Sequence, residues 1–533
     1  MPLDHGSSAG GEQKVAVDRR RQSRLLDWQS PPRPLPGEAA LPEMSAIRAR
    51  ASACVVAACT AIFSACTGDA RRSDSGDPPD VRVGTFEDKG VSYLAAMLSS
   101  DPLVSVGWNG GPVYRLAESA TESADGSVLR FNLRPNVKFH TGEIVTAGRV
   151  RELLLRAASL RVQVTDIETP DEHTLLIRLK RAGFLKIVDL GDYLVDTEEH
   201  LQLRTGPFEI TSLAEGAVLE RFAEYHQGSP SVARVEIRKY PTHRAAWTAM
   251  MRGEVNFLHE VNRDAIEFLE AGGSIKAYPA LRPYVVSLVF NQKHPILQQR
   301  EVRVAITEAI DRDEIVRNGM RGHGEVAEGP FWPHHWAYSP GQHRSTYNPK
   351  AASLRLDSAG LPVRRGRPRQ MPSRFQFVCL IREDDPRFER MALVLQRQLF
   401  DVGVDMQLQT VPLRELEERL RTGSYESFLL EMASGRTLSF PYRWWHSPNP
   451  TGYSAADAAL DRMKFARTDD EVRVAVADVM RILRQDPPAV FLASPREARA
   501  ADRSLDIPYE PDRDIFGTFW QMKRAAVLAE HAR

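Results

Sequence analysis

The sequence contains little cysteine and none of the short motifs that identify common enzymes. Only 4 of its 533 residues are cysteine, which excludes a scaffold held together by several disulfides. We find no glycine-rich phosphate loop, no HExxH, no G-x-S-x-G and no cysteine pair at metal-ligand spacing. These absences argue against a nucleotide-dependent enzyme, a zinc protease and a serine hydrolase. No catalytic residue and no cofactor is therefore expected.

A metal site is also not expected, although four histidines gather in one stretch. They lie in a segment rich in glycine and proline and lack the i, i+4 pairing of a helical metal site. A second segment, residues 363–374, holds five arginines and is predicted to be a solvated loop. The four histidines are His323, His334, His335 and His343.

The sequence has no excess of charge of either sign. It holds 70 basic and 70 acidic residues. Removing the 8 basic and 6 acidic residues of positions 1–65 leaves 62 and 64, a net charge of about −2. This balance gives no electrostatic footprint for nucleic acid, so nucleic acid is not an expected partner.

An uncharged run occurs at residues 51–65, ASACVVAACTAIFSA. Arg48 and Arg50 precede it, and Met44 stands just upstream. A basic start, a short apolar core and small residues before a cut are typical of a secretory signal. The run falls short of the roughly 20 residues that a membrane-spanning helix needs. A buried core helix is the alternative, but it does not account for the flanking charges.

The run ends in Phe63-Ser64-Ala65-Cys66, which resembles a lipoprotein signal. In that class the cysteine is lipidated and becomes the first residue of the mature chain; leucine is usual where this chain has Phe63. We therefore predict a signal peptide at 44–65, lipidation at Cys66 and a polar tether at 66–79.

Residues 1–43 are rich in proline and arginine and lack periodicity. Such a segment cannot bury enough apolar surface to fold. We expect translation to start at Met44, which would leave 1–43 untranslated; a disordered cytoplasmic tail is the alternative. Only Cys379 then remains as a thiol, and its apolar run FVCLI predicts a buried strand residue.

From residue 80 onward a β-rich portion precedes a wound α/β portion. Apolar and polar residues alternate at 128–139, 173–181 and 206–240, which predicts half-buried strands. The run YVVSLVFN at 284–291 is almost continuously apolar and predicts a strand covered on both faces. Further on, RMALVLQRQLF has helical spacing and VDMQLQTV alternates, so strand–helix–strand units with parallel strands are expected.

Three blocks of residues follow one another along the chain. The first combines Leu116-Ala117-Glu118-Ser119 with VKFHTG at 137–142, and the second is Thr205-Gly206-Pro207-Phe208 followed by LERFAEYHQGSPSVARVEIR. The third is Phe290-Asn291 followed by REVRVAITEAIDRDEIV. In this order they resemble the extracytoplasmic solute-binding proteins of family 5, the peptide/nickel-type components of ABC importers. The likeness runs from about residue 80 to the end.

The resemblance implies an α/β chain with the two-lobe, type II periplasmic-binding-protein-like fold and an extra β-rich subdomain on lobe one. Lobe one would take residues 80–282 and the returning 500–533, and lobe two 283–499. The chain would cross twice, near 282 and near 499, to form a hinge.

The implied function is capture of a peptide-like or other small organic solute by closure of the lobes, and delivery to an ABC permease and ATPase complex. The protein would be a monomer, periplasmic or otherwise extracytoplasmic, held to the membrane by its lipid. Two alternatives remain: a degenerate member that acts as sensor or scaffold, and an enzyme on a related fold.

Peptide-binding relatives carry an acidic loop that meets the ligand's amino group, where this chain reads EMASGRTLSFPYRWWHS at 431–447. Arginine suits a carboxylate or phosphate, and aromatic rings offer apolar surface. We therefore expect a ligand with an anionic or acceptor-rich end and an apolar body. Alternatively, the arginine forms a surface ion pair and the tryptophan pair belongs to the core. The predicted ligand-binding residues are Asn291, Trp332, Arg436, Phe440, Tyr442, Trp444 and Trp445.

Overall fold

The computed structural model describes residues 78–86, 88–193, 203–261, 273–339, 346–363 and 373–525. The predicted signal peptide, Cys66 and residues 1–43 lie outside this part of the chain, as does His343. Across the described ranges, no helix is both long enough and apolar enough to span a membrane.

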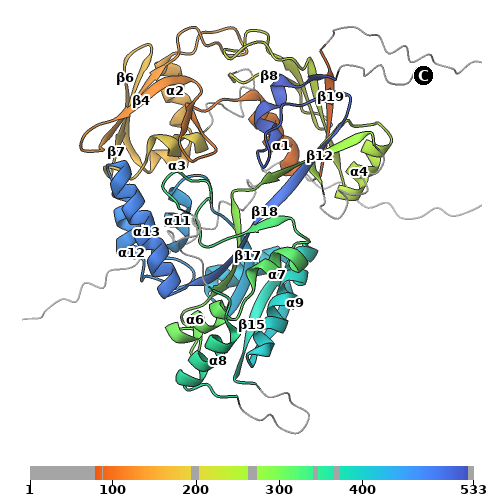
Figure 1. Cartoon of the computed structure of the whole chain (residues 1–533). Coiled ribbons are helices and arrows are strands. Elements are labelled where there is room, and N and C mark those ends of the chain that lie inside the picture. Colours follow the sequence, from red (N-terminus) through yellow and green to blue (C-terminus); the bar gives the residue numbers. More distant parts are fainter. Residues whose placement is uncertain are drawn as a thin grey trace, which may run out of the picture.

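One long strand, β18 (Ala489–Asp502), is shared by two lobes (Figure 1). Its first part, Ala489 to Ala493, pairs with β13 (Tyr284–Phe290). Its last part, Arg496 to Asp502, pairs with β12 (Ile275–Leu281). The chain therefore passes between the lobes twice, once along β18 and once in the short link from β12 to β13.

The second lobe is a sheet with a hydrophobic core on each face. Val286 and Leu288 of β13 enter one core, and Val285 and Val289 enter the other. The expectation of a strand covered on both faces is thus confirmed. The elements of this lobe are β13, α6 (Arg300–Glu308), α7 (Arg312–Glu314), η4 (Ile315–Gly319), β14 (Gly324–Val326), α8 (Pro349–Ser358), β15 (Phe375–Arg382), α9 (Pro386–Asp401), β16 (Val404–Val411), α10 (Leu413–Thr422), β17 (Ser427–Ala433), α11 (Ser439–Trp445), α12 (Asp457–Phe465) and α13 (Asp469–Gln485).

The predicted parallel unit is β15–α9–β16, in which β15 and β16 run parallel. Asp385 caps α9 by accepting a hydrogen bond from the Arg387 backbone N–H (3.0 Å). The helix is followed by Gly403, whose φ of +82° lets the chain turn into β16. Cys379 lies on β15, is fully buried, and its pKa is raised to about 12 by that burial.

The predicted solvated loop at 363–374 is wrong at its C-terminal end, while 364–372 lie outside the described residues. Arg374 is only 8% exposed. Its Nε donates to the Val402 carbonyl (2.8 Å), and its guanidinium pairs with Asp357. The number of arginines in the segment did not indicate that Arg374 connects the start of β15 to the end of α9.

The first lobe holds the other half of the sheet. Gly206 of the Gly-Pro-Phe block packs so closely that a Cβ would lie 2.4 Å from the Ser99 carbonyl carbon, which explains a glycine there. The segment after β18 returns to this lobe, where Ile515 and Phe519 join its core. The elements are β1 (Asp80–Phe86), α1 (Asp88–Ser99), β8 (Phe208–Ser212), β9 (Ala217–Arg221), β10 (Arg234–Tyr240), α4 (His243–Met251), β11 (Phe257–Val261), β12, β19 (Leu505–Asp506), η5 (Ile515–Gln521) and β20 (Lys523–Arg524).

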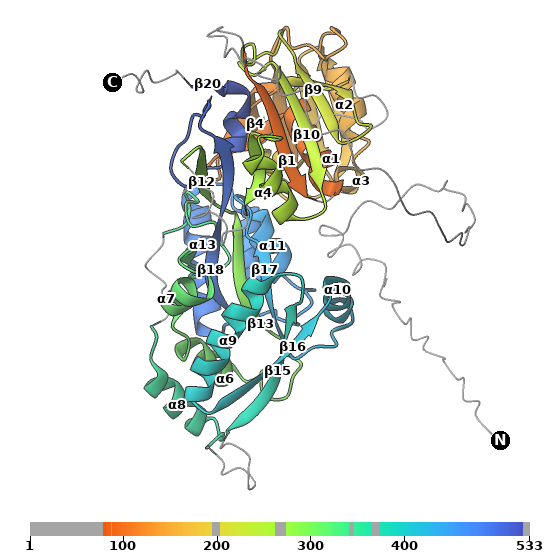
Figure 2. The same cartoon turned by 90° about the vertical axis from the view of Figure 1, so that its right-hand side faces the viewer.

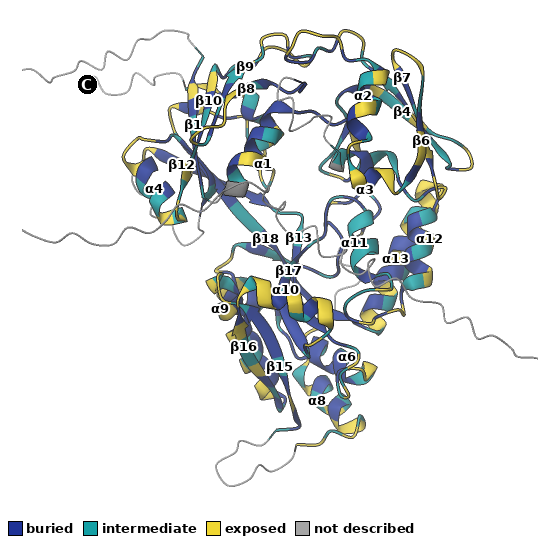
Figure 3. Ribbon diagram, turned by 180° about the vertical axis from the view of Figure 1, so that it is seen from behind, coloured by how far each residue is buried: buried dark blue, intermediate teal, exposed yellow. Residues whose placement is uncertain are grey.

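The two half-sheets form one path in the order β16-β15-β17-β13-β18-β11-β1-β10-β9-β8, with β12 and β14 also paired to β18. Figure 2 shows the two lobes end to end, with β18 running between them. Seen from behind and coloured by burial, β13, β15 and β17 are mostly buried, while the outer face of α10 is exposed (Figure 3).

An extra β-rich subdomain belongs to the first lobe and has its own core. The strand predicted at 128–139 ends at Leu133, because Asn136 takes a φ of +63° and turns the chain. Val137 and Phe139 beyond the turn still enter the core. The elements are β2 (Val104–Val106), β3 (Pro112–Tyr114), β4 (Ala117–Glu122), β5 (Val128–Leu133), α2 (Ala147–Leu154), α3 (Ala158–Arg161), β6 (Val164–Asp171), β7 (Thr174–Leu179) and η2 (Ile187–Asp192), with a sheet in the order β4-β5-β7-β6.

Candidate ligand site between the lobes

The loop between β17 and α11 is fastened to the link that joins the lobes. The backbone N–H groups of Ser434 and Gly435 both donate to the Pro283 carbonyl, at 3.0 Å each. Gly435 has a φ of +58°, and a Cβ there would lie 2.0 Å from the Phe440 ring. The loop therefore needs glycine, and Phe440 covers it. This fixes the next residue, Arg436, beside the interlobe link.

The Arg436 guanidinium lies against two tryptophan rings that come from different lobes. Its central carbon is 5.5 Å from the ring centroids of both Trp108 and Trp332. Trp108 belongs to the turn between β2 and β3 of the subdomain, and Trp332 follows β14 in the second lobe. The Trp332 indole N–H donates to the Trp108 carbonyl (2.6 Å), and the rings meet edge to face at 4.9 Å. Cation–π attraction thus holds Arg436 where the lobes touch.

Arg436 has no carboxylate partner among the described residues, and its buried Nε makes no hydrogen bond there. Burial lowers the pKa of Arg436; Arg282 and Arg513 lower it further, against an opposing effect of Asp514. Asp514 is itself paired with Arg499 at 2.6 Å. A partly desolvated cation without a counter-charge is costly, so this position favours an anion. The alternative of a surface ion pair does not describe Arg436 in this structure.

The tryptophan pair after Arg436 is divided between two environments. Trp445 is 1% exposed in the core of the second lobe and meets Phe491 edge to face at 5.3 Å. It is therefore a core residue, as the alternative interpretation held. Trp444 is only partly buried against the same core.

Two other predicted ligand-binding residues use their polar groups in hydrogen bonds within the protein. The Tyr442 hydroxyl donates to Asp461 (3.0 Å), and burial raises the pKa of this hydroxyl to about 12. The Asn291 amide donates to the Tyr425 carbonyl (2.6 Å), and its oxygen accepts from the Lys293 backbone N–H (3.0 Å). Asn291 thus shapes the chain locally.

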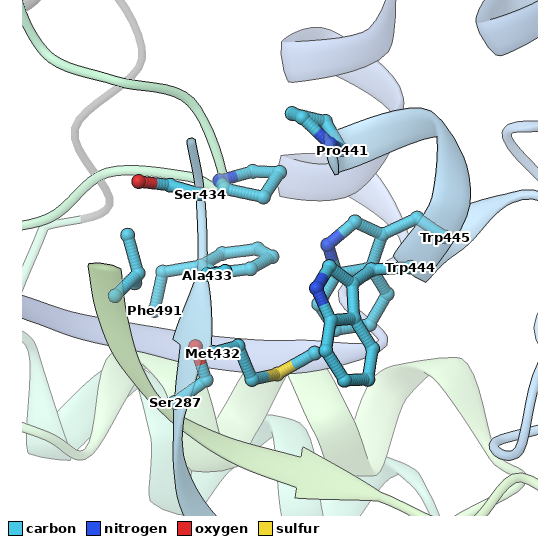
Figure 4. Close-up of a pocket in the computed structure, with 10 residues that line it drawn as sticks. Ser287, Met432, Ala433, Ser434, Pro441, Trp444, Trp445 and Phe491 are labelled. Carbon is cyan, nitrogen blue, oxygen red and sulfur yellow. The ribbon is translucent and has the colours of Figure 1, made fainter. Parts of the chain in front are cut away.

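A small pocket lies between α11 and the sheet of the second lobe (Figure 4). Its free volume is ≈ 10 Å³, about the room of one water molecule. The hydroxyls of Ser287 and Ser434, which help to line it, are buried and make no hydrogen bond to the described residues. The pocket is lined by Val285, Ser287, Pro330, Met432, Ala433, Ser434, Pro441, Trp444, Trp445 and Phe491.

The sequence analysis did not predict Trp108, although this residue forms the first lobe's side of the contact with Arg436 and Trp332. Its turn docks on the second lobe: the Trp336 backbone N–H donates to the Asn109 carbonyl (3.0 Å). Gly110 has a φ of +80°, and a Cβ there would lie 2.4 Å from the His335 ring. A tryptophan inside the glycine-rich turn VGWNGG was the available signal, because a large aromatic at a turn tip needs a surface to cover it.

A second set of contacts joins the subdomain to α11 and α12, as the two views of Figures 1 and 3 also show. Ser439 donates to Asp189 of η2 (2.6 Å), and Phe184 meets Tyr442 edge to face at 6.3 Å. Arg467, just after α12, donates to the Ala124 carbonyl (3.1 Å). The lobes therefore touch at two places.

Two α/β lobes joined by two chain crossings, with aromatic and cationic side chains where they meet, define a type II periplasmic binding protein. The chain belongs to the bacterial extracellular solute-binding proteins, family 5, whose middle-region model matches residues 111–452. This is a family of binding proteins rather than enzymes.

Among its relatives is the oligopeptide-binding protein AppA of Bacillus subtilis, 25% identical over 453 residues, which are 75% of this chain and 82% of that protein. The structure of that AppA with a nonapeptide superposes with a TM-score of 0.65 at 21% identity, covering 85% of this chain and 100% of the other. NikZ of Campylobacter jejuni in complex with Ni(L-His) gives a TM-score of 0.67 at 17% identity, covering 84% and 99%. These structural likenesses establish the fold.

Proposed function

We propose that this chain is the lipid-anchored, solute-binding component of an ABC importer. It captures a peptide-like or other small organic solute between its lobes and delivers it to the permease and ATPase complex. The observation that carries the proposal is Arg436, a cation without a counter-charge among the described residues, held between Trp108 of one lobe and Trp332 of the other. The relative AppA is an oligopeptide-binding protein, which supports a peptide-like solute for this chain.

The proposed lobes are residues 80–282 with 500–533, and residues 283–499. β18 changes from its second-lobe partner to its first-lobe partner between Ala493 and Arg496, a few residues before the proposed boundary at 499. A solute stabilises the closed arrangement only to the extent that it binds closed better than open. A group that contacts Arg436 and Trp108 at once binds the closed arrangement better than the open one, because opening separates these two residues.

Within the predicted ligand set, we assign direct contact to Arg436, with Trp108 added. Trp332 is only 2% exposed and donates its indole N–H to the Trp108 carbonyl, so it would position these two residues. Phe440 and Trp444 would border the solute, since Phe440 covers the loop and Trp444 lines the small pocket. Asn291, Tyr442 and Trp445 would act indirectly. Asn291 holds the segment before β17, Tyr442 bonds to Asp461 of α12, and Trp445 belongs to the core.

The anchor is proposed from the sequence. Residues 44–65 would direct export, Cys66 would carry the lipid, and 66–79 would serve as the tether. The mature protein would then act as a monomer outside the cytoplasmic membrane.

A degenerate member acting as an extracytoplasmic sensor or scaffold is the second candidate.

Whether the lobes close around a bound solute distinguishes the importer component from the sensor or scaffold. The full chain with Cys66→Ser is purified and mixed with a pool of synthetic peptides of two to nine residues. Native mass spectrometry identifies what is retained, and small-angle scattering and thermal unfolding are measured on the complex. A solute-binding protein should show a smaller radius of gyration and a higher melting temperature, by mass action. An unchanged shape and melting temperature, with no peptide retained, contradicts capture of a peptide-like solute.

A further inference from the structure

We infer that Arg436 receives an anionic group of the solute, such as the carboxyl terminus of a peptide, and that a free α-amine is excluded from this position. The inference rests on the proposed function and deepens it, because it states which end of the solute meets the loop.

The charges around Arg436 are of the sign that repels an amine. Arg282 and Arg513 both lower the pKa of Arg436, which places two further positive charges within electrostatic range. Arg513 also lies 5.6 Å from the Trp108 ring, as a second cation over the same indole. An ammonium group placed there would face the Arg436 guanidinium directly. Arg282 and Arg513 add a weaker repulsion, because they are paired with Glu497 (2.9 Å) and Glu510 (2.8 Å).

The neighbouring acids are already engaged by other cations. Asp514 pairs with Arg499 at 2.6 Å, and Glu497 pairs with Arg282 at 2.9 Å. A carboxylate that arrives with the solute therefore meets a guanidinium that pairs with no carboxylate of the described residues.

The aromatic contacts give the guanidinium a defined position before the solute arrives. The ring centroids of Trp108 and Trp332 both lie 5.5 Å from the central guanidinium carbon, and the two rings limit the rotation of the Arg436 side chain. Arginine presents its donors in a planar fork that a carboxylate fits with two parallel hydrogen bonds. A rigid fork loses less conformational freedom on binding than an unsupported one.

The test uses four versions of a synthetic pool of peptides of two to nine residues: both ends free, N-acetylated, C-amidated, and blocked at both ends. Each pool is mixed with the full chain carrying Cys66→Ser, and retained peptides are quantified by native mass spectrometry. We expect the free and N-acetylated pools to be retained equally, and retention of the C-amidated pool to fall at least tenfold.

Three variants locate the effect. Arg436→Met should bring retention of the carboxylate pools down to that of the amidated pools, and Arg436→Lys should keep a weaker preference because charge remains without the fork. Arg473→Met is the matched control. Its guanidinium also lies over an indole, 5.2 Å from the Trp336 centroid, but it has its own carboxylate partner in Asp470 at 2.9 Å. The preference should be unchanged in that variant.

The outcomes are distinct. Peptides retained equally with free and amidated ends, or retained only with a free amine, overturn the inference and leave the proposed function standing. A carboxylate preference that survives in Arg436→Met also overturns it. If no pool is retained by the unmodified site, the peptide-like solute of the proposed function fails and the inference falls with it. Circular dichroism and thermal unfolding check that each variant is folded.

Discussion

Asp189 and Lys464 form a buried ion pair between the β-rich subdomain and α12 of the second lobe. The Lys464 Nζ lies 3.3 Å from an Asp189 carboxylate oxygen, and each side chain is only 5% exposed. Ser439 completes the group: it accepts from Lys464 (2.6 Å) and donates to the other Asp189 oxygen (2.6 Å). Because all three polar groups are satisfied, the pair can persist away from water.

We predict that Lys464→Met destabilises the protein by about 3–5 kcal/mol, since it leaves the Asp189 carboxylate buried without its partner. The double variant Lys464→Met with Asp189→Leu should recover most of the loss, because no charge then stays buried. Arg462→Met is the control: Arg462 lies on the same helix but is 55% exposed in its pair with Asp478, and its loss should cost less than about 1 kcal/mol. The free energy of unfolding in urea measures all three, and a single variant as stable as the double contradicts the prediction.

A second prediction concerns pH. His335 lies where the Trp108 turn docks, and burial lowers the pKa of His335 to about 4. Its Nδ1 accepts a hydrogen bond from the Ala337 backbone N–H (3.1 Å), which protonation would break. The unfolded chain takes up this proton below pH 6.5, whereas the folded chain does so only near pH 4. The free energy of unfolding should therefore fall as pH drops from 6.5 to 4, with about 2 kcal/mol lost through His335 by pH 5.

The His335→Asn variant should have a smaller pH slope, because the Asn oxygen can accept the same hydrogen bond and does not titrate. The slope should not vanish, since burial lowers the pKa of His140 and His259 as well. Denaturant unfolding at several pH values between 4 and 7 measures the difference. Equal slopes in the two proteins would show that His335 does not resist protonation.

The resemblance to the family implied the two-lobe class, and periodicity predicted several of the elements, because it reports which faces of a strand or helix are buried. β13 and the β15–α9–β16 unit are examples, where apolar spacing and the Gly403 turn suffice. What it could not predict were contacts between distant segments. Trp108 and Asp189 look ordinary in their local context, and their partners Arg436 and Lys464 are more than two hundred residues away. Long-range pairing of this kind follows from the docking of lobes, which local patterns do not encode.

The third prediction tests the shape of the Arg436 loop. Gly435→Ala would place a methyl group 2.0 Å from the Phe440 ring at a φ of +58°. We expect it to cost about 2–4 kcal/mol, from backbone strain together with displacement of the ring. Gly423→Ala is the matched control, because Gly423 has a φ of +72° with nothing within 4 Å of the added Cβ. It should cost only the strain, about 1 kcal/mol.

A second variant distinguishes the steric clash with Phe440 from the backbone strain at residue 435. Adding Phe440→Ala to Gly435→Ala should restore part of the lost stability, since the ring that the methyl meets is removed. The double variant is compared with Phe440→Ala alone, both by thermal unfolding. If Gly435→Ala costs no more than Gly423→Ala, the loop is free to move and Arg436 is not held as the structure indicates.

The last prediction concerns the anchor, which lies outside the described residues. The order of Arg48 and Arg50, the uncharged run 51–65 and Cys66 predicts that Cys66 is lipidated and becomes the first residue of the mature chain. Cys66→Ser should move the protein from the membrane fraction to the soluble extract, because two or more acyl chains are what hold such a chain firmly to a bilayer. Cys379→Ser is the control: Cys379 is fully buried in β15, so its loss should leave the membrane fraction unchanged. Mass spectrometry of the mature N-terminus decides the matter, since a chain that starts before residue 66, or one that remains membrane-bound with serine at 66, cannot be anchored in this way.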